Sequence, residues 1–70
     1  MPQFDPEQIQ VIKSALEEVM TRVPPEWSTV EVKAHLAEYI LKAAARGQTT
    51  FDTLVSEGAD QIQVILSLFT

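Results

Sequence analysis

The chain has 70 residues, a formal net charge of −5 and no cysteine, and these facts exclude several classes of protein. Seventy residues make one small domain, residues 1–70, whose single core is barely sufficient for stability. Without cysteine the fold contains no disulfide, and no thiolate can bind a metal or attack a substrate. The negative charge disfavours nucleic acid as a partner, because acidic surfaces repel phosphate backbones.

The sequence favours neither secretion nor membrane binding. The N-terminus has no basic segment followed by an apolar core, so no secretory signal is expected. The apolar run over residues 62–69 is too short to span a bilayer. No Lys or Arg follows Arg46, which disfavours binding of the C-terminal segment to anionic lipid. We therefore expect a cytoplasmic protein with no membrane partner.

The first predicted helix covers about residues 6–23. Asp5 is a suitable N-cap, and Gln8 stands three residues later, where it completes a capping box. Apolar residues recur at helical spacing after it. The pair Pro24-Pro25 then ends the helix.

The second predicted helix covers about residues 29–46. Ser28 and Glu31 have the spacing of a capping box, so Ser28 is the expected N-cap. Gly47 stands where a left-handed residue commonly ends a helix. The connection of about five residues after Val23 makes this helix an antiparallel neighbour of the first.

The second helix is apolar over more than half of its circumference. Its first apolar stripe contains Val32, Leu36, Tyr39, Ile40 and Ala43. A second stripe on roughly the opposite side contains Val30, Ala34, Ala37, Leu41 and Ala45. Only Glu31, His35, Glu38, Lys42 and Arg46 form a polar edge. Such a helix has to be covered on two sides, by its neighbours or by a second copy of the protein. We expect it to be the most buried helix, with Leu36, Ile40 and Ala43 in the core.

The third predicted helix covers about residues 51–69, with Thr50 as its N-cap. Gly58 lies on its apolar face, and we expect the helix to continue there, straight or kinked, at a close crossing against the second helix. In a second interpretation Gly58 ends one short helix and Asp60 caps another. A strand over residues 62–69, paired with another molecule, is a third interpretation. The predicted fold is all-α, a small bundle of three antiparallel helices.

The segment from Leu36 to Gln48 resembles a pattern found in small uncharacterised bacterial helical proteins. In that pattern an acidic N-terminal helix is followed by a helix of the form lA-x-x-IL-x-x-A-x-x-G and a short third helix. The resemblance covers about residues 4–57, rests on apolar positions, and ends at Gly58. It implies an all-helical fold and carries no activity.

Glu31, His35 and Glu38 form the one cluster of polar residues that could carry chemistry. Two carboxylates one turn on either side of an imidazole could hold a metal or transfer protons. The chain offers no second His and no Cys as a further ligand. The favoured interpretation is a solvated stripe in which Glu38 pairs with Lys42. We expect no catalysis, no metal and no cofactor, with a metal- or small-ligand-binding helical protein as an alternative.

A helix-turn-helix protein that binds DNA is a second alternative. Ala43 and Gly47 match the small residue and the turn glycine of that motif. Thr53, however, stands where an apolar packing residue is expected. The helix that would enter the groove carries Asp52 and Glu57 but no Lys or Arg.

The favoured function is a protein-interaction or structural module that self-associates. The apolar residues exceed what three short helices can bury, and exposed apolar patches mark interfaces. The expected interface residues are Val64, Leu68, Phe69 and Leu41. A two-fold homodimer through the third segment, with or without exchange of the tail, is the simplest assembly. A helix of another protein is the alternative partner.

Overall fold

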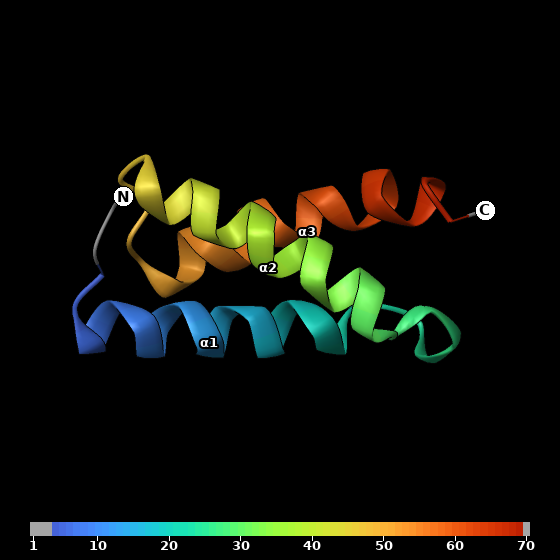
Figure 1. The fold of residues 1–70 in the computed structure, drawn as a ribbon, viewed down its shortest axis with the longest axis horizontal. Helices are drawn as coiled ribbons and strands as arrows, with labels where there is room; N and C mark the ends of the chain where they lie inside the picture. Colours follow the sequence, from blue (N-terminus) through green and yellow to red (C-terminus); the bar gives the residue numbers. More distant parts are fainter. Residues whose placement is uncertain (1–3, 70) are drawn as a thin grey trace.

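The computed structural model describes residues 4–69, which form three α-helices joined by short connections (Figure 1). Helix α1 spans Pro6–Thr21, α2 spans Val30–Ala45 and α3 spans Phe51–Ser67, and a 3-10 turn, η1, spans Pro25–Trp27. Each helix runs antiparallel to the one before it (Figure 1). No strand occurs within residues 4–69. The predicted all-α three-helix bundle is confirmed, and the strand and broken-helix interpretations of the third segment are wrong.

The N-termini of α1 and α3 are capped as predicted. The Asp5 side chain accepts a hydrogen bond from the Gln8 N–H at 2.8 Å, and the Asp5 N–H donates to the Gln8 side chain at 3.3 Å. This is the predicted capping box. The Thr50 hydroxyl accepts from the Thr53 N–H at 3.3 Å. Both caps satisfy N–H groups that have no partner inside the helix.

The N-terminus of α2 lies one residue later than predicted. Thr29, not Ser28, is the N-cap, and its hydroxyl accepts from the Val32 N–H at 3.3 Å. Ser28 is instead the C-cap of η1, because its N–H donates to the Pro25 carbonyl at 3.2 Å. Either of two adjacent hydroxyl residues can cap a helix, and the conformation of the preceding turn determines which of them is the N-cap.

As predicted, a left-handed Gly47 terminates α2. Its φ of +104° lies in the left-handed region that favours glycine. The Gly47 N–H donates to the Ala44 carbonyl at 3.0 Å, and the Gln48 N–H donates to the Ala43 carbonyl at 3.1 Å. This pair of bonds is a Schellman motif, which ends the helix and turns the chain toward α3.

One core lies between the three helices. Its largest fully buried side chains come from all of them: Leu36, Ile40, Leu54, Val19 and Val32. Leu36, Ile40 and Ala43 are buried as predicted. Five residues of α2 and five of α3 are buried. The two helices thus bury the same number of residues, and four of those in α2, Val32, Leu36, Ile40 and Ala43, are at most 1% exposed.

Gly58 lies inside α3, where that helix packs into the groove between the other two. A β-carbon at this position would lie 2.9 Å from Cγ2 of Val19 in α1 and 3.4 Å from Cδ1 of Ile40 in α2. The predicted close crossing is therefore present. Its nearest contact is with α1, however, and not with the second helix, which lies slightly farther away.

Candidate interaction surface

The second apolar stripe of α2 lies on the outside of the bundle. Val30 is 80% exposed and Leu41 is 42% exposed. Of the alanines, Ala34 and Ala45 are exposed and Ala37 is half-buried. We call these five residues the outer stripe. The flanking helices thus cover only one of the two apolar sides of α2.

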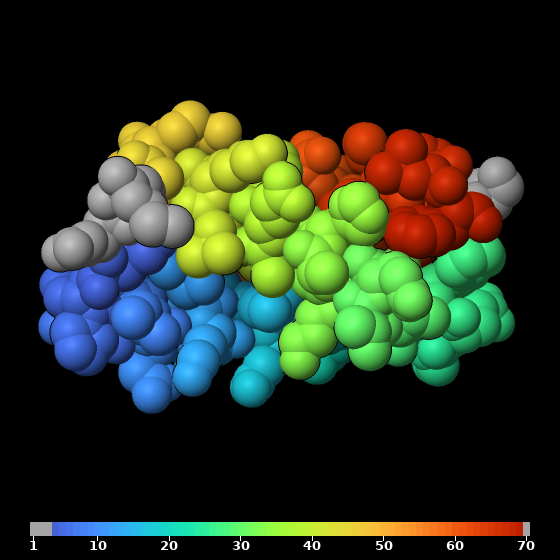
Figure 2. All heavy atoms as spheres, viewed as in Figure 1, coloured from blue at the N-terminus to red at the C-terminus, as the bar shows by residue number. Residues whose placement is uncertain are grey.

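The position of α2 makes the outer stripe accessible. Helix α2 lies in front of α1 and α3 in Figure 1 and crosses α3 obliquely. In Figure 2 the green and yellow atoms of α2 form the front of the molecule, between α1 below and the C-terminal part of α3 above. Within residues 4–69, no other helix passes over the front of α2 in this view.

Helix α1 extends the apolar surface beside α2. Glu18 and Arg22 line a groove between α1 and α3. Leu16 and Met20 lie two residues from Glu18 and therefore about 200° round the helix, on the side of α2. Both are half-buried and pack against the core. Half-buried apolar side chains of α1 thus lie on the side of that helix that faces α2.

The four interface residues predicted from the sequence lie on two separate surfaces. Val64 and Leu68, 56% and 66% exposed, lie one turn apart on α3. The Phe69 ring contacts His35 edge-on, with ring centroids 5.6 Å apart. Leu41 lies on the other side of α2, about 200° round the helix from Tyr39, whose hydroxyl reaches α3. Leu41 therefore belongs to the outer stripe and not to the surface of α3.

The Glu31, His35 and Glu38 side chains are all exposed along the polar edge of α2. Glu38 forms the predicted ion pair with Lys42, with an N–O distance of 3.0 Å. The hydrogen bond and the positive charge of Lys42 lower the pKa of the Glu38 carboxyl. Among residues 4–69 no group of three or more His, Cys, Asp or Glu side chains could hold a metal ion. The structure therefore gives this cluster the geometry of a solvated stripe.

Sequence reasoning missed one polar contact between helices. The Tyr39 hydroxyl of α2 donates to Oε2 of Glu57 in α3 at 3.0 Å. Desolvation raises the pKa of Tyr39, and the Glu57 carboxylate raises it further, while the positive charge of Arg46 lowers it. The partners are 18 residues apart, so no local pattern could have linked them.

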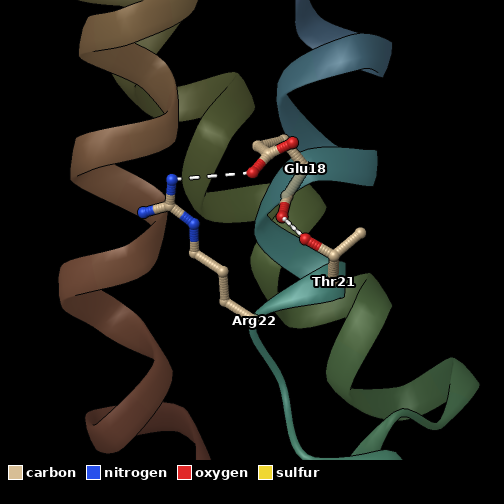
Figure 3. Close-up of polar contacts among 3 residues, drawn as sticks. All are labelled: Glu18, Thr21 and Arg22. Atoms are coloured by element: carbon tan, nitrogen blue, oxygen red, sulfur yellow. Dashed lines mark hydrogen bonds and ion pairs between the residues drawn. The ribbon is translucent and has the colours of Figure 1, made fainter.

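The groove between α1 and α3 has a volume of about 350 Å³ and contains both charges and an aromatic ring. Arg22 pairs with Glu18 at 3.6 Å, and both side chains are about half exposed (Figure 3). The Thr21 hydroxyl donates to the Glu18 carbonyl at 2.6 Å (Figure 3). In the described part of the chain, no buried side-chain N or O atom lacks a partner. The Glu18–Arg22 contact at this groove is a solvent-exposed ion pair within α1.

Two further findings complete the description of the surface. No helix between residues 4 and 69 is both long enough and apolar enough to cross a lipid bilayer. Compared with known proteins, the chain matches no family model, no curated sequence and no solved structure.

Proposed function

We propose that the protein is a protein-interaction module that works by self-association through the outer stripe of α2. The observation that supports this proposal is an exposed apolar face that extends from Val30 to Ala45 and contains no charged residue. At about 1.5 Å per residue this face is about 22 Å long. A continuous apolar face on a small acidic protein is typical of an interface.

A second copy is the simplest partner for this face. In a two-fold dimer one patch covers the same patch of the other copy, so a single surface is sufficient. The bundle also gains stability, because a 70-residue chain buries a smaller fraction of its surface than a larger domain does. Covering the outer stripe would bury α2 on both of its apolar sides.

The geometry favours α2 over α3 as the interface. On α3 the exposed apolar residues Val64 and Leu68 span a single turn. The outer stripe extends over about four turns, from Val30 to Ala45. A face of one helix is small for an interface, so we expect a reversible dimer with a dissociation constant in the micromolar range.

The substitution Leu41→Glu tests this proposal. It places a charge in the outer stripe without touching the core, because Leu41 is already partly exposed. We expect the dissociation constant to rise about tenfold or more, since the charge loses its water in the dimer. Sedimentation equilibrium over a range of protein concentrations measures the change.

The matched control is Leu68→Glu, the same substitution at an exposed leucine of α3. We expect it to leave the dissociation constant unchanged. A wild-type protein that stays monomeric at millimolar concentration would contradict self-association. A dimer that Leu68→Glu dissociates and Leu41→Glu does not would move the interface to α3.

A further inference from the structure

We propose that two copies pair through α2 in the antiparallel orientation, about a two-fold axis that passes near Ala37 and Glu38. This inference rests on the proposed self-association and specifies its geometry. It follows from the order of side-chain sizes along the outer stripe and from the order of charges along the polar edge beside it.

The order of large and small side chains along the outer stripe, Val30, Ala34, Ala37, Leu41 and Ala45, suits antiparallel pairing. With the axis at the middle of the stripe, Val30 faces Ala45 of the second copy, and Leu41 faces Ala34 of the second copy. Each large exposed side chain is then set against a methyl group. Alternation of large and small residues across a helix pair is how such faces interdigitate.

The charges of the polar edge reverse along the helix. Glu31 lies near the N-terminus of α2 and Glu38 near its middle, whereas Lys42 and Arg46 lie at its C-terminal end. In an antiparallel pair the same edge of each helix lies on the same side of the interface. Glu31 and Lys42 of the second copy then lie within two residues, or about 3 Å, of the same level. The antiparallel arrangement also sets the positive end of each helix dipole beside the negative end of the other.

Glu38 is the one residue of the polar edge whose charge disfavours this arrangement. It lies close to the axis, so it approaches Glu38 of the second copy. Its ion pair with Lys42, at 3.0 Å within each chain, reduces the repulsion between the two carboxylates. The like-charge contact therefore weakens the dimer without excluding it.

Parallel pairing fits the same surface less well. Each residue would lie beside the same residue of the second copy. Ala34 would then face Ala34 and leave a gap, while Leu41 would contact Leu41. Lys33 and Glu38 of the second copy would form an opposite-charge pair. The helix dipoles, however, would lie side by side in the same direction, which is unfavourable.

Disulfide trapping distinguishes the two orientations, because the natural chain has no cysteine. Two single-cysteine variants, Ala34→Cys and Leu41→Cys, are oxidised separately and as an equal mixture. In the antiparallel dimer the two cysteines of the mixture face each other. Two copies of the same variant hold their cysteines about 10 Å apart along the helix, beyond the Cα separation of about 7 Å that a disulfide spans. We expect covalent dimers to form in the mixture and not in either variant alone.

The control is Ser14→Cys, at an exposed position of α1, which reports disulfides formed by random collision. Cross-linking of each variant alone, with less in the mixture, would show parallel pairing and overturn the inference. A dimer detected by sedimentation but trapped by none of these cysteines would also overturn it and leave self-association intact. A monomer at every concentration would overturn the proposed function itself.

A charge exchange gives an independent test of the orientation. Glu31→Lys alone and Lys42→Glu alone are each expected to raise the dissociation constant about fivefold, the effect of two exposed ion pairs per dimer. The double variant is expected to bind more tightly than Lys42→Glu alone, because the pairs between copies re-form with their signs reversed, while the loss of the Lys42–Glu38 ion pair keeps its affinity below the wild-type value. A double variant that binds no more tightly than Lys42→Glu alone would contradict the antiparallel pairing.

Discussion

At the scale of single residues, the two glycines of the chain are required for different physical reasons. Gly47 has open space around its α-carbon but a φ of +104°, which L side chains rarely adopt. Gly58 has an ordinary helical backbone but no space, because a β-carbon there would overlap Val19. The sequence predicts both as special positions, and only the packing shows which constraint acts on Gly58.

Gly58→Ala is expected to destabilise the protein by about 1 kcal/mol. The alanine gains about 1 kcal/mol in helix propensity. The new methyl group overpacks the core, however, which costs about 1–3 kcal/mol. Val19 cannot turn away, since it is fully buried and β-branched. Urea unfolding measures the difference between the two proteins.

The Val19→Ala background provides the control for this prediction. Without the Val19 methyl groups the clash disappears, so Gly58→Ala should stabilise that variant through helix propensity alone. If Gly58→Ala stabilises the wild-type protein as well, the crossing is looser than the structure indicates.

Tyr39→Phe is expected to reduce the free energy of unfolding at neutral pH by about 1 kcal/mol, the net contribution of one hydrogen bond. The pKa of Tyr39 is raised in the folded state, so the folded protein holds this proton more tightly than the unfolded chain. The stabilisation is therefore complete below pH 10, the ordinary pKa of tyrosine, and is lost as the pH rises through the folded-state pKa.

The difference in stability between the wild-type protein and Tyr39→Phe, measured by urea unfolding, should shrink above pH 10. Tyr39 is the only tyrosine, so the ultraviolet absorbance of tyrosinate reports its ionisation directly. A difference that does not change with pH would mean that the Glu57 contact makes no contribution in solution.

At the scale of the helices, the sequence predicts what local chemistry determines. The Asp5 capping box, the Thr50 cap and the Gly47 terminus each depend on residues within five positions of one another, and all are present. The N-cap of α2 lies one residue later than predicted because Ser28 is the C-cap of η1. Such a turn depends on how Trp27 packs against the core, which no capping rule describes.

Contacts between helices are the part of the structure that the sequence does not predict. The apolar pattern of α2 shows two stripes but does not indicate which neighbour covers them. Only the packed structure separates Leu41 from Val64 and Leu68, and only the packed structure joins Tyr39 to Glu57. These features depend on how the helices rotate about their axes, and small differences in packing decide that rotation.

Thr29→Ala tests the corrected start of α2. Loss of an N-cap hydroxyl costs about 1 kcal/mol, so this substitution should lower the free energy of unfolding by that amount. Ser28→Ala, one residue earlier, is the matched control and should have little effect, because the Ser28 side chain caps no helix. The reverse result, measured by urea unfolding, would restore Ser28 as the cap.

At the scale of the whole molecule, self-association predicts that the melting temperature depends on protein concentration. Dimerisation stabilises only the folded state, so the wild-type melting temperature should rise with concentration. Leu41→Glu should melt at one temperature across the same range. Scanning calorimetry at several concentrations measures both, and a wild-type melting temperature that is independent of concentration would contradict the dimer.

The exposure of the outer stripe has a consequence for which substitutions the protein tolerates. Leu36 and Ile40 cannot become polar without unfolding the chain, whereas Ala34 and Leu41 can change without loss of the core. In the proposed dimer, stability and association therefore depend on residues on opposite sides of the same helix. Single substitutions in the outer stripe are then expected to change the affinity or the orientation of that dimer while the bundle itself stays intact.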